Sequence, residues 1–466
     1  MKTSKTILLV HPPFCTPASP SYALSNLYSR LRENCSSKAF EIKALDLNIE
    51  FHEKKYPEFQ RYAKNFLKNY NPEEYNLKTK EFFSHTKEDY AKSNKDVVKG
   101  LKPNLFDEML SIILACKPDF VAFSVIYASQ AFYTYALLGE LKKRNIFTII
   151  GGPAVNELLK KTADKTMESE FEMLEFFKDV SQKQDGSACL NATVPDFSIW
   201  DEKKYFTPEI VIPVKTSTSC YYKQCAFCSH YSSREYAEYS LEEIEALVKI
   251  RKNGLVFIVD DMIKKERLVE ISKIFAKCKI AWTCQLKPTK EFDAATLKTL
   301  SDSGLKMIIW GVESGSDRIL KLMNKGTNIK DIKEVLSESK KAGIVNCCYI
   351  LLGFPTETEE GFMQTIDFIK DRSEDIDLIL TSVFGLQKNT PVYNNPSKFG
   401  ITKIAESERT ILDNKITYET ERGLSNFEAK KLRQKYKKSL EKLNKYPKSM
   451  NFFREHMLCL IKSKSD

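Results

Sequence analysis

Short apolar runs alternate with amphipathic helical stretches along the second half of the chain, between residues 206 and 385. The stretch Ser240–Lys249 is typical, with Ser240 as the expected N-cap of a helix and Glu243 as its capping-box partner. Six such strand–helix units predict a partial (β/α)6 barrel of the TIM type, whose active site lies at the carboxyl ends of its strands. The predicted strands are residues 210–217, 255–260, 280–286, 305–313, 345–353 and 378–385.

The first part of the chain has an α/β pattern of its own. It opens with a buried strand that two prolines end, Thr6–Phe14, and later apolar runs cover 118–125 and 147–153, with helical stretches between. A parallel sheet with helices on both faces, the doubly wound or Rossmann-like arrangement, is the expected fold of residues 1–160.

Three segments fall outside these two α/β domains. Residues 52–110 are rich in Lys, Glu, Tyr and Phe and are predicted to be a helical insertion, broken at its prolines. Residues 161–205 are assigned to a linker that ends in an aromatic strap, and the barrel is assigned to residues 206–395. Residues 396–466 are predicted to be helical. They would form either a cap that closes the barrel or a lid over the substrate, and the sequence does not separate the two.

Three cysteines lie close together just after the first barrel strand: Cys220, Cys225 and Cys228. Three thiolates can hold three corners of a cubane iron–sulfur cluster and leave one iron open for chemistry. A zinc site with His230 as fourth ligand is an alternative, although His230 follows Cys228 by only two residues. Buried core cysteines are a second alternative, which the polar residues around them disfavour.

The cysteine segment resembles that of the radical S-adenosylmethionine (radical SAM) enzymes. Its last two cysteines enclose an aromatic, Phe227, and a β-like run, Val211–Ser217, precedes it. The first gap has four residues where the superfamily usually has three. The Gly-Val-Glu-Ser-Gly stretch that ends at Gly315 and the Gly-Phe-Pro turn that ends at Pro355 resemble the ends of the family's fourth and fifth strands.

This resemblance implies a 4Fe-4S cluster on the three cysteines and S-adenosylmethionine (SAM) beside it. The implied reaction is cleavage of SAM to a 5′-deoxyadenosyl radical, with electrons from a donor such as flavodoxin or ferredoxin. Lys325 is a candidate partner for the SAM carboxylate, with a solvated surface lysine as the alternative. The candidate SAM-binding residues are Phe227, Glu313, Ser314, Lys325 and Gly353.

The N-terminal domain resembles the cobalamin-binding domain that precedes the barrel in one class of these enzymes. Ser124, Gly151 and Gly152 would then face the corrin or its nucleotide tail. An Asp-x-His-x-x-Gly motif is absent, which implies binding without an axial histidine. A Gly-Glu-Gly-Glu stretch common in relatives is absent from residues 156–185, so a cofactor-free α/β module for partner docking stays an alternative.

The function expected from this resemblance is cobalamin-dependent methylation of an unactivated carbon in a peptide or secondary metabolite. Cobalamin-independent oxidation, epimerisation or cyclisation is the first alternative, and a non-catalytic zinc-binding interaction module is the second.

Four further residues are catalytic candidates. Cys347 and Cys348 are adjacent on the predicted fifth strand, so one faces the barrel interior, where it could donate a hydrogen atom, and the other faces the helices. Both could instead be buried small hydrophobes, which is the commoner role of cysteines on a buried strand. Asp260 and Asp261 end the second strand, where they could bind substrate or lie near the cobalt face, or simply cap the next helix.

The composition of the chain limits which classes of partner and which cellular compartment we expect. The chain has 72 basic and 62 acidic residues, for a net charge of +10, but its lysines are scattered among glutamates and no nucleic-acid motif is present. No apolar run reaches transmembrane length, and twelve cysteines without a disulfide-type pattern suit a reducing compartment. We therefore expect a cytoplasmic protein with no membrane or nucleic-acid partner.

Overall fold

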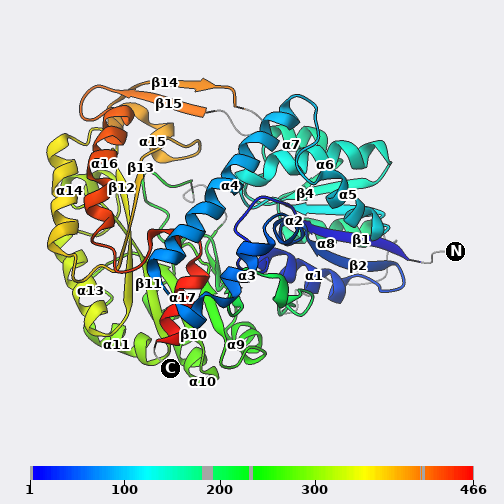
Figure 1. The fold of residues 1–466 in the computed structure, drawn as a ribbon, viewed down its shortest axis with the longest axis horizontal. Helices are drawn as coiled ribbons and strands as arrows, with labels where there is room; N and C mark the ends of the chain where they lie inside the picture. The colour runs from blue at the N-terminus through cyan, green and yellow to red at the C-terminus, as the bar shows by residue number, and fades with distance from the viewer. Residues whose placement is uncertain (1–3, 181–192, 230–234, 410, 412–414, 465–466) are drawn as a thin grey trace. The chain divides into compact units, whose positions relative to one another are not determined.

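The computed structural model describes residues 4–180, 193–229, 235–409, 411 and 415–464. The chain forms two compact units (Figure 1). The first contains residues 1–69, 77–210 and 408–414, and the second contains residues 70–76, 211–407 and 415–466.

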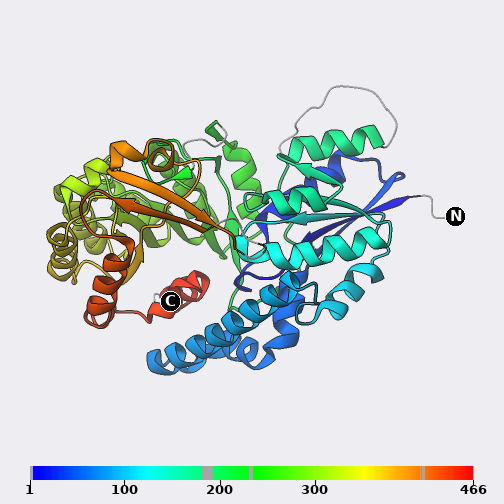
Figure 2. The same cartoon turned by 90° about the horizontal axis from the view of Figure 1, so that it is seen from above.

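The first unit is built on a five-stranded parallel sheet with the strand order β2-β1-β3-β4-β5. Its strands are β1 (Lys5–His11), β2 (Phe40–Asp46), β3 (Phe120–Ser124), β4 (Phe147–Gly151) and β5 (Lys165–Met167). Helices α6 (Ala131–Lys143) and α8 (Glu170–Val180) lie on opposite sides of this sheet (Figure 2). The predicted doubly wound α/β fold is therefore confirmed.

The segment expected to be a helical insertion contains separate helices, which end before Pro57, Pro72 and Pro103 and resume at or after them. Pro57 and Pro72 occupy first helical positions, where the missing N–H has no partner in any case. The helices around and within the insertion are α1 (Tyr22–Asn34), α2 (Leu47–Lys55), α3 (Pro57–Asn65), η1 (Phe66–Asn69), α4 (Pro72–Val98) and α5 (Phe106–Ala115). Later come η2 (Ala128–Gln130) and α7 (Glu157–Thr162).

The segment assigned to a linker, residues 161–205, differs from the expectation. It contains β5 and α8, which complete the first sheet, and η3 (Glu202–Lys204). Its aromatic end packs on the first unit, because Trp200 Nε1 donates to Ser25 Oγ at 2.8 Å and the Tyr205 hydroxyl donates to Asp46 Oδ2 at 2.9 Å. Part of the predicted linker, residues 181–192, lies outside the described residues.

The second unit contains a six-stranded parallel sheet whose strands follow chain order, β13-β12-β11-β10-β9-β6. All six predicted strands are present, and the partial barrel is confirmed. They are β6 (Val211–Val214), β9 (Leu255–Ile258), β10 (Ala281–Leu286), β11 (Leu305–Glu313), β12 (Val345–Leu352) and β13 (Leu378–Val383). A short antiparallel pair, β7 (Ser217–Thr218) and β8 (Ala237–Glu238), stands beside this sheet.

Helices cover the outer face of the barrel sheet, in a row visible in Figure 1. They are α9 (Leu241–Lys249), α10 (Lys265–Cys278), α11 (Ala294–Asp302), α12 (Asp317–Leu322), α13 (Ile329–Lys341) and α14 (Glu359–Asp371). Asn346 joins β12 to this layer. Its Oδ1 accepts from Trp310 Nε1 and Ser339 Oγ, and its Nδ2 donates to two backbone carbonyls.

The C-terminal region is only partly helical. Residues 396–466 were predicted to be helical, and this prediction was wrong for two segments. They are β14 (Ile401–Ser407) and β15 (Lys415–Thr420), which form an antiparallel hairpin. β15 alternates half-buried with exposed residues, β14 is mostly exposed, and both include lysine and glutamate, so the apolar signal of the hairpin is weak. The helices here are α15 (Pro391–Asn394), η5 (Pro396–Phe399), α16 (Asn426–Glu441), η6 (Lys448–Asn451) and α17 (Arg454–Ser463).

Helix α17 packs against β9, β10 and β11 of the barrel sheet. Cys347 Sγ lies 3.8 Å from Met457 Sδ of this helix, whereas Asn346, the residue before it, points to α13. Side chains alternate along a strand, so α17 covers the inner face of the sheet. Among the described residues, none of the helices combines the length and apolar character that crossing a bilayer requires.

We expect Asn346→Ala to lower the free energy of unfolding of the second unit by about 3–5 kcal/mol, because it leaves several buried polar groups without partners. Calorimetry of the purified protein would measure this loss. Ser439→Ala, which removes an exposed hydroxyl that donates to the Tyr436 carbonyl, is the control and should change stability by less than about 0.5 kcal/mol. A similar small change for both variants would contradict the role given to Asn346.

Candidate active site

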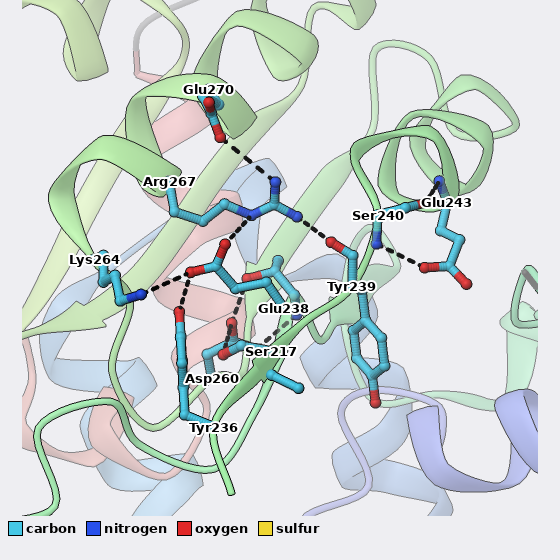
Figure 3. A network of polar contacts seen from close by, with 12 residues as sticks. Ser217, Tyr236, Glu238, Tyr239, Ser240, Glu243, Asp260, Lys264, Arg267 and Glu270 are labelled. Atoms are coloured by element: carbon cyan, nitrogen blue, oxygen red, sulfur yellow. Dashed lines mark hydrogen bonds and ion pairs between the residues drawn. The ribbon is translucent and has the colours of Figure 1, made fainter.

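The cysteine segment is a loop whose two ends are tied together. Its ends form the β7–β8 pair, with Ser217 opposite Glu238 and Thr218 opposite Ala237. Asp260 is buried at the end of β9 and accepts from the Thr216 N–H at 2.7 Å, from Ser217 Oγ at 3.0 Å and from the Thr216 hydroxyl (Figure 3). The carboxylate therefore fixes the point at which the loop leaves the barrel.

A second layer of polar contacts holds the returning end of the loop (Figure 3). Glu238 accepts from the Tyr236 hydroxyl at 2.7 Å and lies 3.5 Å from Lys264 Nζ and 3.8 Å from Arg267 Nε. Arg267 also donates to the Tyr239 carbonyl. Both strands of the loop base are thus fixed to α10 or to β9.

The middle of the loop docks on the segment that follows α12. The Ala226 N–H donates to the Met323 carbonyl at 2.8 Å, and the Tyr222 hydroxyl donates to the Asn324 carbonyl at 2.8 Å. A Cβ on Gly326 would lie 2.3 Å from the Tyr222 hydroxyl oxygen, so glycine is needed there for the ring to pack. Cys220, Cys225 and Cys228 are half-buried on this fixed loop. His230 lies outside the described residues.

Two buried lysines lie beside the cysteines. Lys325 is 5% exposed, and its Nζ is 2.8 Å from Glu313 Oε1. Lys287 follows β10, is also 5% exposed, and its Nζ lies 3.3 Å from the centre of the Tyr222 ring. The field of Cys225 acts on both ammonium groups.

The pKa values of this group reflect burial and mutual charge. Burial raises the pKa of the Cys225 thiol to about 11, against the opposing effect of Lys325 and Lys287. Burial also lowers the pKa of Lys287. Burial acts in the same direction on Lys325, but Glu313 and the cysteines outweigh it and the pKa of Lys325 is raised.

This donor set fits an anionic iron–sulfur cluster. Three thiolates and a reduced cluster carry net negative charge, and two buried ammonium groups would balance it. The described residues contain no group of three His, Cys, Asp or Glu side chains that could hold a single metal ion. In a cubane cluster each thiolate binds a different iron, so the three cysteine sulfurs need not meet at one point.

Glu313 ends β11 with a positive φ of 66°, and Gly311 leaves room for its side chain. A Cβ on Gly311 would lie 2.8 Å from Lys325 Nζ and 2.9 Å from Glu313 Oε1. The ion pair therefore lies directly over Gly311. Phe227 belongs to the same group, since its ring centre is 5.6 Å from Lys325 Nζ.

Ser314 and Gly353 are placed differently from these residues. Ser314 is fully buried, accepts from the Ser316 N–H and contacts Thr365 Oγ1, so its hydroxyl supports the turn into α12. Gly353 has a φ of 71°, and a Cβ there would lie 2.5 Å from Ala429 Cβ of α16. Its N–H donates to the buried Glu357 carboxylate.

The four catalytic candidates separate into different environments. Cys347 faces α17 and Cys348 faces the opposite side of β12, and burial raises the pKa of both thiols. Asp260 is engaged by the loop base, and Asp261 is exposed. The structure thus brings none of these four into the group formed by Glu313 and the two lysines.

In the first unit, Ser124 ends β3, and Gly151 and Gly152 follow at the end of β4. Gly152 has a φ of 115°, and a Cβ there would lie 2.4 Å from the Val125 carbonyl oxygen. A Cβ on Gly151 would lie 3.2 Å from the Met167 carbonyl oxygen. The close approach that these glycines allow is therefore to the protein's own backbone.

Sequence reasoning missed two residues of this region. Lys287 is one, and the only signal for it was its position immediately after a strand, where active-site residues of barrels lie. Glu357 is the other. Its carboxyl group is fully buried, and Oε1 has no hydrogen-bond partner among the described residues.

Residues 214–369 match the family model of the radical SAM superfamily. An uncharacterised methyltransferase of Pyrococcus horikoshii is 24% identical over 320 residues, which cover 59% of this chain and 69% of that protein. The ribosomal protein uS12 methylthiotransferase RimO of Caldicellulosiruptor saccharolyticus is 25% identical over 235 residues. That match covers 46% of this chain and 53% of RimO, so the chain spans about half of that relative.

Two solved structures resemble nearly the whole chain at 13% identity. The radical SAM methyltransferase TsrM from Kitasatospora setae, with cobalamin and a [4Fe-4S] cluster bound, has a TM-score of 0.61 and covers 94% of this chain and 89% of TsrM. The cobalamin-dependent radical SAM enzyme OxsB, with aqua-cobalamin bound, has a TM-score of 0.60 and covers 93% of this chain and 67% of OxsB.

The second unit is therefore the domain of a radical SAM enzyme, and the whole chain has the fold seen in cobalamin-dependent members. Residues 214–369 form a radical SAM domain, whose chemistry uses a 4Fe-4S cluster and SAM. Such an enzyme acts on a substrate and takes electrons from a reductant.

Glu357 makes the stability of the folded protein depend on pH. Burial raises the pKa of its carboxyl group to about 7, partly offset by the Gly353 N–H. The native state thus holds a proton that the unfolded chain releases near pH 4.3, and the resulting stability is present at low pH and lost as the pH rises to about 7. We expect Glu357→Gln to remove a fall of up to about 3 kcal/mol between pH 4.5 and 7.

Urea unfolding at several pH values would measure this difference between the wild type and the variant. Glu360→Gln, an exposed position three residues away, is the control and should keep the wild-type slope. Equal slopes for wild type and Glu357→Gln would rule out a raised pKa at this carboxyl group.

Proposed function

We propose that this chain is a cobalamin-dependent radical SAM methyltransferase that methylates an unactivated carbon. The observation that carries the proposal is the fixed three-cysteine loop beside two buried lysines, at the carboxyl ends of the strands of a partial barrel. The similarity of the whole chain to structures of cobalamin-dependent enzymes supports the cobalamin part.

In this proposal Cys220, Cys225 and Cys228 ligate the 4Fe-4S cluster, and Lys287 and Lys325 balance its charge. Glu313 has two acceptor oxygens, of which one is 2.8 Å from Lys325 Nζ, so the carboxylate can also receive the amino group of SAM. Lys325 would receive the SAM carboxylate, and Phe227 and Gly353 would border the same ligand.

When bound, the cluster supplies the electron that cleaves SAM, and cobalamin supplies a transferable methyl group. The residues of the chain hold and orient these groups. Asp260 fixes the start of the cysteine loop, and Ala226 and Tyr222 fix its middle against the segment after α12. Such anchoring keeps the reacting atoms in a narrow range of positions, which a radical reaction needs.

Cobalamin would bind at the carboxyl edge of the first sheet, where Ser124, Gly151 and Gly152 lie. Ligands of doubly wound folds bind at this edge. Because the glycines accommodate the protein's own backbone, the backbone of these loops is the part proposed to face the corrin. The proposed acceptor is a peptide or small molecule, and the proposed electron donor is a flavodoxin or ferredoxin.

The test is metal analysis of protein purified anaerobically and reconstituted with iron, sulfide and hydroxocobalamin. About four irons and one cobalt per chain, with reductive cleavage of SAM, are expected. Cys225→Ala should lose iron and SAM cleavage but keep cobalt. Iron without cobalt would contradict the methyltransferase and favour cobalamin-independent chemistry, and zinc in place of iron after reconstitution would overturn the proposal.

Lys287 provides a finer prediction. Lys287→Met removes a positive charge beside Cys225, so it should lower the reduction potential of the cluster by roughly 50–100 mV. Spectroelectrochemical titration would measure the shift. Lys290→Met, which removes an exposed charge three residues away, is the control and should leave the potential within about 10 mV of wild type. Equal shifts in both variants would contradict the role of Lys287.

A further inference from the structure

Among the residues that the structure describes, the side-chain contacts of one cation on the inner face of the barrel sheet are to aromatic rings. The guanidinium carbon of Arg454, the first residue of α17, lies 5.8 Å from the ring centre of Phe257 and 5.6 Å from that of Tyr349. Within the described ranges, Arg454 makes no ion pair and no side-chain hydrogen bond. By contrast, Arg267 and Arg144 each have a carboxylate partner.

The position of the two rings places this guanidinium inside the curve of the sheet. Phe257 belongs to β9 and Tyr349 to β12, and β10 and β11 lie between these strands. Strands three places apart in a flat sheet are about 14 Å apart, so a group within 6 Å of both rings must lie on the concave side.

Arg454 also points toward the active-site end of the barrel. Met457, one helical turn later, contacts Cys347, whereas Arg454 contacts Tyr349, two residues nearer the carboxyl end of β12. Tyr349 is paired with Gly311, the residue over which Glu313 and Lys325 meet. The guanidinium therefore lies next to the layer of the proposed SAM site.

The aromatic contacts of Arg454 leave the N–H donors of its guanidinium group available to a ligand. Aromatic faces hold the guanidinium by cation–π attraction but take none of its five N–H donors. Tyr349 is fixed in turn, because its hydroxyl donates to Asn451 Oδ1 at 3.2 Å. Arg454 itself is only partly buried. A planar fork of donors fixed in this way matches the two oxygens of a carboxylate or phosphate.

We propose that Arg454 binds an oxyanion, a carboxylate or phosphate, of the acceptor substrate. This inference rests on the proposed function, since it assigns a chemical class to the substrate of the same site. An anionic anchor at Arg454 would hold the substrate beside the Glu313–Lys325 pair and leave its reacting carbon facing the carboxyl ends of the strands. Arg454 then positions the substrate and takes no part in bond breaking.

The test uses radiolabelled benzoate, phenyl phosphate and benzamide as probes, in equilibrium dialysis with the reconstituted, unreduced protein in saturating SAM. We expect saturable binding of benzoate or phenyl phosphate, and the tighter of the two identifies the oxyanion. Arg454→Met should weaken that binding by about tenfold or more, and Arg454→Lys, which keeps the charge but not the fork, by less. Benzamide binding should not respond to either variant.

Arg422→Met is the matched control, because it removes an arginine that is exposed between β15 and α16. It should bind both anions as the wild type does. The inference is overturned if neither anion binds saturably or if Arg454→Met binds as the wild type does. If the reconstituted wild-type protein holds no iron or does not cleave SAM, the proposed function is refuted, whereas the result on anion binding still stands.

Discussion

The buried carboxylate of Asp260 is the contact on which the rest of the site depends. Burial raises the pKa of this group, and hydrogen bonds from Thr216 and Ser217 oppose that shift. A buried carboxylate is tolerable only when donors or cations surround it, and the charge of Lys215 adds a smaller effect to these hydrogen bonds. Those donors belong to the chain that is about to form the cysteine loop, so the requirements of one buried charge fix the start of that loop. A loop with one free end would have to lose far more conformational entropy to bring three thiols to one cluster.

The two buried lysines are subject to the same requirement as the buried carboxylate, because each needs partners that compensate its charge. A buried ammonium group is costly unless an anion lies near it. Lys325 has Glu313, whereas Lys287 contacts the face of Tyr222 and has the cysteine thiols, Lys325 and Glu291 as its charged neighbours. Its burial is therefore best balanced when those thiols are ionised, which is the state that iron requires. The region is arranged for a bound anionic group more than for the free thiols.

How much the sequence could predict depended on the range of each signal. Strands such as 305–313 were predictable because parallel strands buried on both faces are continuous apolar runs. β5 has three residues and its helix α8 follows at once, so neither stood out from a linker. The cysteine spacing and the strand ends around Glu313 could be found along the chain. The pairing of Lys287 with Tyr222, and the packing of α17 on the inner face of the sheet, are contacts between distant segments and leave no local pattern.

The packing of α17 decides where in the barrel chemistry can take place. Cys347 and Cys348 were candidate hydrogen donors because one of the two must face inward. Cys347 is the one that faces α17, and Met457 covers it. At the level of Cys347 the inner face is therefore filled by protein. One step nearer the carboxyl ends, at Gly311 and Tyr349, the helix has reached its first residue, and charged or half-buried side chains replace apolar ones. Helix α17 thus fills the barrel beneath the site. Arg454, its first residue, is the part of the helix that a bound substrate would contact.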